Sequence, residues 1–477
     1  MSGKYKAVAS GAITNGKPVL VNTDGTVSLV ALDTTPALGT AVSTFGGNHG
    51  PSLCKLTDTT FLVTGRDSTN SYTATTAIGT VSNGSISFGT KAAISAIGAT
   101  SNVIVPVRLT DNKFVLLWTD AGDTNKGKAI VGTVSSGSIT YGSAVTFETG
   151  QTYLNLVNAG VALTTSKFII VFEDASNSSY AKAIVGDVSG TSITFGTAVT
   201  YNTANSSKYA VVDKLTDTKV IIAYSETPQG ERGRALVATI SGTSISFGSQ
   251  VTYDDGGSLT VQHHSIVALS ETQFVISYLD KDESNYGRSI VGSVSGTTVT
   301  MPSTTDYNAA STQAYHTNCV KINDTQFAVS YSPTSPSTTR QFRIGTVASN
   351  AVTFDSAVTF NGSTGDPNST AGMTLLGTSD LLIGWRPDAT EFPVVDYMLQ
   401  SANLTSENYI GIASGGTYAD TAEATIDVVG TVNKDQSGLT AGQTYYVQTD
   451  GTLGTSADDP SVVAGTAISA TELIVKG

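Results

Sequence analysis

Hydrophobic and polar residues alternate along most of the chain, and one alternating segment recurs. Its clearest copy, LSETQFVISYLD at residues 269–280, is a polar turn followed by a strand. The first large hydrophobic residue of this strand, here called the anchor, occurs seven times at intervals of 52 to 54 residues: Phe61, Phe114, Phe168, Val220, Phe274, Phe327 and Leu381. Four residues later, on the same strand face, six copies have an aromatic residue: Trp118, Phe172, Tyr224, Tyr278, Tyr331 and Trp385. The chain is therefore a repeat array.

Each repeat predicts four short strands. In the fifth repeat they are VQHHSIVAL, the anchor strand, GRSIVGSV and TTVTMP. The fourth strand places a large residue 27 positions after the anchor in six copies: Phe88, Tyr141, Phe195, Phe247, Met301 and Phe354. Four strands in about 50 residues, repeated in tandem, are typical of a propeller blade. The sequence therefore predicts an all-β, seven-bladed β-propeller.

The two ends of the array predict how such a ring would close. The seventh copy lacks the fourth-strand phrase, because Asn408 stands 27 residues after its anchor, Leu381. Near the N-terminus, LGTAV at residues 38–42 matches FGTAV at residues 195–199. We therefore expect a strand around residues 38–45 to complete the last blade, which would cover two exposed strand edges.

Residues 1–29 and 403–477 lie outside the predicted propeller, which spans residues 30–402. AITNGKPVLVNTDGTV, which begins at Ala12, and GLTAGQTYYVQTDGTL, which begins at Gly438, share a Gly-containing turn, an apolar strand and an Asp-Gly turn. Asp-Gly flanked by strands favours a tight hairpin. Because the termini of a domain often lie close together, we expect an N-terminal hairpin and a C-terminal segment to form one small β-barrel or sandwich.

Four phrases at the chain ends are similar to a module of known proteins: VASGAITNGKPVLVNTDGTVS, NYIGIASGGT, SGLTAGQTYYVQTDGTL and VVAGTAISATELIVKG. They resemble a terminal module of bacteriophage virion proteins, especially tail-fibre and capsid-decoration proteins of marine phages. The resemblance implies a structural component of the virion, made in the host cytoplasm without a signal peptide. It also implies that the small domain contacts other virion proteins, and it favours a homotrimer.

Composition narrows the choice of partners. Charged residues make up 13% of the chain and the net charge is −13, so no basic surface is expected for nucleic acid. No run of about 18 apolar residues is present that would insert into a membrane, and the first residues lack the apolar core of a secretion signal. Cys54 and Cys319 fall in repeats that are not neighbours, so we expect no disulfide.

No catalytic, metal-binding or nucleotide-binding motif of a known kind occurs, and we expect no cofactor. Acidic residues follow five anchors by six positions: Asp67, Asp120, Asp174, Glu226 and Asp280. Eight residues after four of them stand Lys128, Lys182, Arg234 and Arg288. We expect these to be exposed ion pairs beside the loop between strands two and three, and not a catalytic carboxylate set.

A second acidic set lies in the turns between strands one and two: Asp58, Asp111, Asp217, Glu271 and Asp324. Asp and Thr side chains commonly bond the backbone of such turns. We therefore expect these acidic residues to cap the turns.

All four histidines, His49, His263, His264 and His316, stand ten to twelve residues before an anchor. His263 and His316 share one register in adjacent repeats. Their side chains are therefore candidates for a metal site or a pH-sensitive lining at the mouth of the central channel. Hydrogen-bonded or solvated histidines at the rim are the alternative.

The loops that differ most between repeats connect strands two and three or lead into the first strands. Binding is usually carried by variable loops on a fixed frame, and their Tyr, Ser, Asn and Thr content suits polar recognition, including sugars. The candidate ligand-face residues are Tyr72, Asn125, Asn177, Arg232, Asn285, Tyr286 and Arg340.

These observations predict a non-enzymatic virion protein, in which a tail fibre or appendage presents a propeller to a host-surface glycan or protein. Two alternatives stay open. One is a capsid decoration or fibre protein whose propeller has no specific ligand. The other is a depolymerase that acts on surface polysaccharide.

Overall fold

The computed structural model describes the chain except for residues 1–2, 34–35, 46–50, 68–69, 72, 83, 98–103, 156–157, 203–205, 228–231, 255–260, 282–285, 303, 309–313, 334–338, 362–370, 387–391, 400, 459 and 477. The described residues contain no α-helix, and no helix among them could span a membrane. A single turn of 3₁₀ helix, η2 (Ala121–Asp123), follows one of the strands.

The chain divides into two compact units. Unit 1 comprises Met1–Ala37, Ser82–Ser85 and Met398–Gly477, and unit 2 comprises Leu38–Val81 and Ile86–Tyr397. The N-terminal limit lies eight residues beyond the expected residue 29, and the C-terminal limit lies five residues before the expected residue 402. Both shifts follow from the short strands β4 (Leu32–Asp33) and β40 (Ser401–Ala402), which pair with each other within unit 1.

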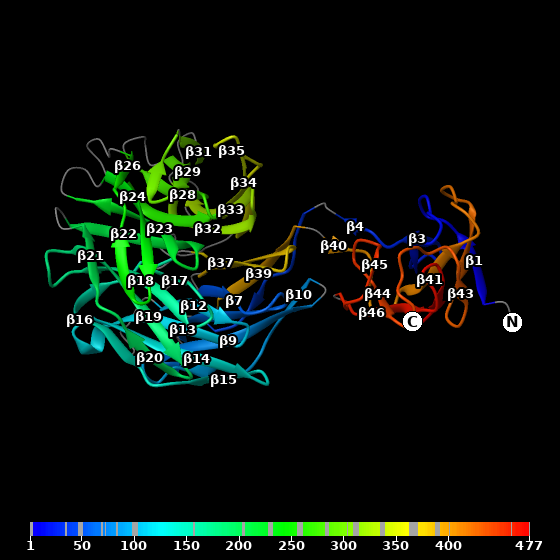
Figure 1. Cartoon of the computed structure of the whole chain (residues 1–477), viewed down its shortest axis with the longest axis horizontal. Helices are drawn as coiled ribbons and strands as arrows, with labels where there is room; N and C mark the ends of the chain where they lie inside the picture. The colour runs from blue at the N-terminus through cyan, green and yellow to red at the C-terminus, as the bar shows by residue number, and fades with distance from the viewer. Residues whose placement is uncertain are drawn as a thin grey trace. The chain divides into compact units, whose positions relative to one another are not determined.

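Unit 2 consists of antiparallel sheets that follow the sequence repeats (Figure 1). The first strands are β7 (Ser52–Lys55), β12 (Ile104–Thr110), β17 (Gly160–Ala162), β22 (Ser207–Thr216), β27 (Val261–Ala268), β32 (Ala314–Asn323) and β37 (Gly372–Leu376). The anchor strands are β8 (Thr60–Asp67), β13 (Lys113–Asp120), β18 (Lys167–Asp174), β23 (Lys219–Glu226), β28 (Gln273–Asp280), β33 (Gln326–Pro333) and β38 (Asp380–Gly384).

Each anchor strand is followed by a longer strand that pairs with it. These third strands are β9 (Thr73–Ser82), β14 (Lys126–Ser135), β19 (Tyr180–Ser189), β24 (Arg232–Ser241), β29 (Tyr286–Ser295), β34 (Arg340–Ala348) and β39 (Pro393–Met398). The fourth strands are β10 (Ser85–Phe88), β15 (Ser138–Tyr141), β20 (Ser192–Phe195), β25 (Ser244–Phe247), β30 (Thr298–Thr300) and β35 (Ala351–Phe354).

Most of these sheets are four strands deep, as predicted, but the outermost position holds two strands, because a fifth strand pairs with the same third strand as the fourth does. The fifth strands are β11 (Ala92–Ala93), β16 (Val145–Tyr153), β21 (Val199–Asn202), β26 (Val251–Asp254), β31 (Thr304–Asn308) and β36 (Val358–Asn361). β16 also pairs with β18, so the second and third repeats share one sheet of ten strands. The third strands are long enough, at up to ten residues, to pair with two short strands in succession.

In the seventh repeat the fourth and fifth strands come from the N-terminal segment. β5 (Ala37–Leu38) and β6 (Val42–Ser43) both pair with β39, and Val394 is the partner of Val42. Consecutive first strands contact one another in chain order, and β37 also contacts β7. In Figure 1 the gold strand β37 accordingly lies beside the blue β7.

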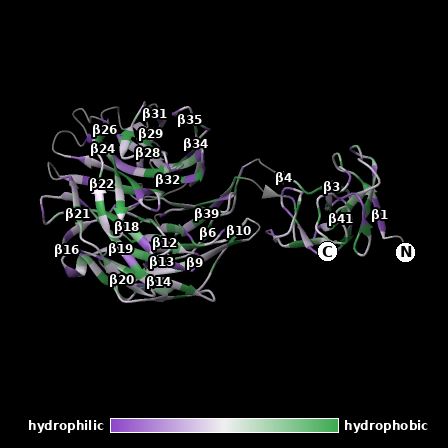
Figure 2. Ribbon diagram, viewed as in Figure 1, coloured by the Kyte–Doolittle hydropathy of each residue, from purple (hydrophilic) through white to green (hydrophobic). Residues whose placement is uncertain are grey.

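The core of unit 2 lies between the sheets of successive repeats. Each buried cluster combines residues of two consecutive repeats; one cluster, for example, joins Phe61 and Val63 of the first repeat to Leu382 and Val394 of the seventh. Hydrophobic residues lie along the strands (Figure 2). Every described anchor is fully buried, which confirms the positions that the repeat pattern assigned to the core.

The acidic residues at the ends of the anchor strands form the predicted ion pairs. Lys128, Lys182, Arg234 and Arg288 bind their partners at 2.5 to 2.6 Å. The expectation that these pairs are exposed is wrong, since all four carboxylate residues are buried. Two of the cations reach a further carboxylate on a fifth strand: Lys182 lies 3.1 Å from Glu148, and Arg288 lies 3.0 Å from Asp306. The four pairs therefore link anchor strands to third strands, and the two further contacts link third strands to fifth strands.

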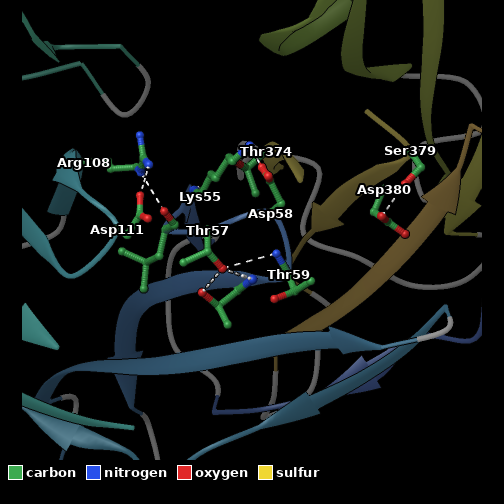
Figure 3. A network of polar contacts seen from close by, with 11 residues as sticks. Lys55, Thr57, Asp58, Thr59, Arg108, Asp111, Thr374, Ser379 and Asp380 are labelled. Carbon is green, nitrogen blue, oxygen red and sulfur yellow. Dashed lines mark hydrogen bonds and ion pairs between the residues drawn. The ribbon is translucent and has the colours of Figure 1, made fainter. Parts of the chain in front are cut away.

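The second acidic set binds cations on the first strands. Asp58, Asp111, Asp217 and Asp324 each pair with the basic residue three positions earlier, at 2.5 to 2.7 Å. The turns are capped by the preceding residue instead, as where Thr57 Oγ1 accepts hydrogen bonds from the backbone N–H groups of Thr59 and Thr60 (Figure 3). Arg108 Nε donates to the Leu56 carbonyl of the previous repeat at 2.7 Å. The contact of Arg108 with Leu56 therefore joins the second repeat to the first.

Unit 1 contains two five-stranded sheets. One has the order β1 (Lys4–Val8), β42 (Glu423–Asp427), β41 (Tyr409–Ser414), β2 (Pro18–Val21) and β3 (Val27–Leu29). The other has the order β43 (Val432–Asn433), β47 (Leu473–Val475), β46 (Val462–Ala467), β44 (Thr444–Val447) and β45 (Leu453–Gly454). Leu20 of the first sheet and Val447 of the second belong to one buried cluster, so the two sheets pack on each other.

The two predicted Asp-Gly hairpins are present and match. The β2–β3 and β44–β45 pairs are antiparallel, and Gly25 and Gly451 have φ angles of 83° and 77°. Asp24 accepts a hydrogen bond from the Thr26 N–H at 2.9 Å, and Asp450 accepts one from the Thr452 N–H at the same distance. Both glycines thus supply the left-handed conformation that the turn requires.

Candidate functional site

Three first strands are irregular at the same place. The pairing of β22, β27 and β32 with their anchor strands shifts between Lys208 and Val211, Gln262 and Ser265, and Tyr315 and Asn318. In each case two residues of the first strand stand opposite one residue of the anchor strand, which is a β-bulge. Bulges redirect side chains and are frequent beside binding and active sites.

The first residue of each bulge has a left-handed backbone. The φ angles of Tyr209, His263 and His316 are 54°, 52° and 56°. For residues other than glycine this conformation costs on the order of 1–3 kcal/mol, and such strain is concentrated at functional sites. All three residues stand eleven positions before their anchors, so the same strained conformation recurs in three adjacent repeats.

These three residues line one cavity of about 380 Å³. The ring centroids of Tyr209 and His263 are 5.7 Å apart, and those of His263 and His316 are 4.6 Å apart. The complete lining, here called the histidine pocket, comes from the second to sixth repeats: Tyr153, Leu154, Asn155, Val171, Phe172, Glu173, Ala181, Ser207, Lys208, Tyr209, Ala210, His263, His264, His316 and Thr317.

The lining combines apolar and polar groups. Leu154, Val171 and Phe172 offer hydrocarbon surface, whereas Ser207 and Lys208 offer hydrogen-bond donors. Asn155 Nδ2 donates to the Tyr209 carbonyl at 3.4 Å and so holds the first bulge. A cavity with apolar walls and a few placed polar groups is the usual form of a small-molecule site, and this one suits a ligand that has both hydroxyl groups and an apolar face.

The imidazole groups of the pocket are held neutral. Burial, then the neighbouring His316 and Lys281, lower the pKa of His263 to about 3. Burial and the Arg340 charge lower the pKa of His316 to about 4. Neutral imidazoles carry one donor and one acceptor each, so between pH 5 and 8 they can bond hydroxyl groups without changing charge. The pH-sensitive lining that the sequence suggested is therefore not expected in that range.

His264 has a different role from its neighbour. It is fully buried, and its Nε2 lies 3.3 Å from Ser225 Oγ, while its Nδ1 lies 3.3 Å from the Tyr253 hydroxyl. Burial and the adjacent His263 lower its pKa to about 3. His264 is thus the hydrogen-bonded structural histidine that the sequence analysis kept as the alternative.

Among the described residues, no third metal ligand accompanies His263 and His316. Within the part of the chain that the structure describes, no group of three or more His, Cys, Asp or Glu side chains is placed to hold a metal ion. His49 lies outside the described residues. A metal site at His263 and His316 therefore stays a prediction.

The described loop candidates do not line the histidine pocket. Tyr72 and Asn285 lie outside the described residues, and the other five, Asn125, Asn177, Arg232, Tyr286 and Arg340, belong to five different repeats and do not line the histidine pocket. Arg340 is buried, and its charge acts on His316. The sequence analysis missed Tyr209, although its position eleven residues before Val220 is the register of His263 and His316.

The two cysteines are free thiols, as expected from their positions in distant repeats. Burial raises the pKa of both Cys54 and Cys319 to about 12, so neither thiol is ionised at neutral pH. They therefore act as small core side chains.

We expect acid to weaken folding through the buried His264 and the half-buried His263 and His316. Their pKa values are about 3 to 4 in the folded chain, against about 6.5 when unfolded. The unfolded state therefore binds more protons below pH 6.5, so their stabilising contribution is complete above that pH and is lost as the pH falls toward 4. The slope is about 1.4 kcal/mol per pH unit for each histidine.

Urea unfolding at pH 7, 6 and 5 measures this effect. A His316→Asn variant should lose less stability between pH 7 and pH 5 than the unmodified chain, because one titrating group is absent. Equal losses in the two proteins would show that His316 is not held neutral.

Among known proteins, this chain is similar only to solved structures. No family model matches the sequence, and no curated protein matches it. The BP39L lectin from Burkholderia pseudomallei aligns with a TM-score of 0.53 at 7% identity, over 76% of this chain and 99% of the lectin.

Two further structures have TM-scores below 0.5, so no argument rests on them. An ulvan lyase aligns with 0.47 at 10% identity, over 74% of this chain and 95% of the lyase. A mutant of the Aleuria aurantia lectin aligns with 0.40 at 11% identity, over 69% of this chain and 99% of the lectin. The first comparison shows that this chain has a β-propeller-like all-β fold similar to that of the Burkholderia lectin.

Proposed function

We propose that this chain is a non-enzymatic attachment protein of a phage-type virion, which binds a host-surface saccharide through the histidine pocket. In this proposal unit 2 is a closed seven-bladed propeller and unit 1 contacts other virion proteins. We favour a location on a tail fibre or appendage over capsid decoration. A pocket that binds host saccharides functions at the part of the virion that contacts the host surface.

The observation that carries the proposal is a row of three uncharged rings on residues whose backbones are strained. Tyr209, His263 and His316 are turned by equivalent bulges to line one cavity, at ring separations of 5.7 and 4.6 Å. A pyranose ring has an apolar face of C–H groups that packs on such rings, and hydroxyl groups that bond neutral imidazoles. Tyrosine supplies rigid contact area at low entropy cost.

Two features support a closed ring of seven blades. The seventh repeat receives β5 and β6 from the N-terminal segment, and a buried cluster joins that repeat to the first. A closed propeller leaves only short, protected strand edges. Closure would also fix the distances among the first strands from which the pocket is built.

The virion location rests on the resemblance of the chain ends to the terminal module of phage virion proteins. Unit 1 unites those ends, with β1 paired to β42 and β2 paired to β41. Such a unit could bind the particle or form a homotrimer while unit 2 is presented to the host.

A glycan array tests the binding function. We expect the full chain to bind a restricted group of bacterial surface saccharides, and Tyr209→Ala to lose at least tenfold in affinity because it removes the stacking ring. Ile468→Ala is the control, since Ile468 is exposed in unit 1 and lies outside the pocket. Equal loss in both variants, or no binding to any saccharide, would contradict the proposal.

Two further assays separate the alternatives. Release of new reducing ends from host polysaccharide by the unmodified chain would support a depolymerase in place of a binding protein. Electron cryomicroscopy of the particle that carries the chain would locate the propeller. Density over the capsid lattice would favour decoration, whereas density at the tail or its fibres would favour attachment.

A further inference from the structure

The two sheets of unit 1 share one topology. In each sheet the first strand in chain order lies at an edge and is followed across the sheet by the fifth, fourth, second and third strands. Both sheets also have an irregularity at the same place. The pairing of β2 with β41 shifts between Val19 and Leu20, and that of β44 with β46 shifts between Tyr445 and Tyr446. The strand pairing therefore gives residues of one sheet counterparts in the other.

The two sheets pack with unlike faces in contact. Leu20 and Ile412, from one face of the first sheet, belong to buried clusters with Val447, Ala464 and Val475 of the second. The counterparts of these three second-sheet residues lie on the opposite face of the first sheet, the face of Val19, and they are Val21, Ile410 and Val428. The contact is therefore head-to-tail: one face of the first sheet covers the other kind of face on the second.

The first sheet has an open groove on the face that is covered in the second. The groove has a volume of about 370 Å³, and it is here called the first-sheet groove; Gly3, Lys4, Tyr5, Val21, Ile410 and Val428 line it. Val21, Ile410 and Val428 are only half-buried, whereas their counterparts in the second sheet are fully buried. The first-sheet groove thus lacks the cover that the first sheet itself gives to the second.

The second sheet in turn has an apolar outer face. This second-sheet face consists of one apolar residue from each of four strands, which are half-buried or exposed: Val432, Tyr446, Val463 and Ile474. Val432 pairs with Ile474, and Tyr446 pairs with Val463. The solvated face of an antiparallel sheet is normally polar. The second-sheet face corresponds to the face of the first sheet that carries Leu20, which is buried inside unit 1.

One pair of positions differs in a complementary way. Inside unit 1, Asn433 Nδ2 donates a hydrogen bond to Asp427 Oδ2 across the contact between the sheets, at 3.0 Å. The counterpart of Asn433 is Tyr5 in the first-sheet groove, and the counterpart of Asp427 is Ile474 on the second-sheet face. A polar pair at the internal contact therefore corresponds to an apolar pair on the two open surfaces.

We propose that a second copy of this chain places its second-sheet face on the first-sheet groove, with Ile474 of one copy against Tyr5 of the other. The contact between copies would repeat the packing between the two sheets of unit 1. Because its two surfaces lie at opposite ends of the pair of sheets, the contact is heterologous and builds a closed ring or a filament. This inference specifies how unit 1 forms the proposed oligomer, and it does not depend on saccharide binding.

Sedimentation velocity of the full chain over a range of concentrations tests this contact. We expect oligomers that dissociate on dilution. Tyr5→Asn and Ile474→Asp should each weaken association about tenfold or more, because each places a polar group against an apolar partner in the core of the interface. Ile468→Asp is the control, since Ile468 is 45% exposed in unit 1 and belongs to neither surface.

Restoration distinguishes a lost contact from a damaged fold. The double variant Tyr5→Asn with Ile474→Asp recreates between copies the pair that Asn433 and Asp427 form inside unit 1, so it should associate more strongly than either single variant. Mixing the two single variants should also restore association, because each then meets its complementary surface on the other.

Three results would overturn the inference. They are a monomer at every concentration, an equal loss in Ile468→Asp, and a double variant that associates no better than the single variants. None of these results bears on saccharide binding by unit 2, which the glycan array measures separately.

Discussion

Gly186→Ala should destabilise unit 2, although replacing a glycine inside a strand by alanine normally stabilises a protein. Gly186 stands opposite the anchor Phe168, and a methyl group at Gly186 would lie 2.3 Å from the Phe168 ring. The ring is fully buried and cannot withdraw to solvent. Forcing a methyl group into a packed core costs about 1–3 kcal/mol, which urea unfolding at pH 7 would measure.

The repeats themselves contain the matched control. Glycine stands opposite phenylalanine at Phe61, Phe114, Phe168, Phe274 and Phe327. Where the anchor is the smaller Val220, its partner is Ala238. The double variant Phe168→Val with Gly186→Ala should therefore lose less stability than the sum of the two single losses, with a coupling of about 0.5–3 kcal/mol. Additive losses would show that the ring does not exclude the methyl group.

Lys182→Met should produce the larger loss of stability, about 3–5 kcal/mol. Lys182 Nζ lies 2.6 Å from an Asp174 oxygen and 3.1 Å from a Glu148 oxygen, and both carboxylates are largely buried. Methionine preserves most of the side-chain volume but leaves these carboxylates without their shared cation. Urea unfolding at pH 7 would measure the loss, and Asp174→Asn in the same chain should recover part of it by removing one buried charge.

Lys6→Met is the control for this prediction. Lys6 pairs with Glu423 at 2.5 Å, but both side chains are more than 60% exposed, so water replaces the lost partner and no measurable change is expected. A Lys182→Met loss no greater than that of Lys6→Met would mean that burial of the pair does not matter.

The repeat pattern predicted most of unit 2 because each blade strand is defined by local periodicity. The anchors, the third and fourth strands, and the Asp-to-Lys/Arg spacing are all fixed within one repeat. The burial of these acid–base ion pairs was not predictable, because it depends on strands that lie elsewhere in the chain. The shared register of Tyr201, Tyr253 and Tyr307 indicated outer-strand packing, and these buried residues lie in β21, β26 and β31. That they belong to strands separate from the fourth strands was not predicted.

The histidine pocket could be foreseen only in part. A shared register placed His263 and His316 near each other, and their ring centroids are 4.6 Å apart. The bulges that turn them were not visible, because a bulge changes strand pairing without changing the spacing to the anchor. For the same reason the sequence analysis overlooked Tyr209. It chose its candidate ligand-binding residues from the variable loops instead. The pocket forms where first strands of several repeats meet, which is a property of the assembled sheets.

A crystal structure of the full chain with the best saccharide from the array tests the central claim most directly. We predict sugar density in the histidine pocket, with the ring against Tyr209 and His263 and polar contacts to His316 and Lys208. Density on another face of unit 2 or on unit 1, with the pocket occupied only by solvent, would contradict the account.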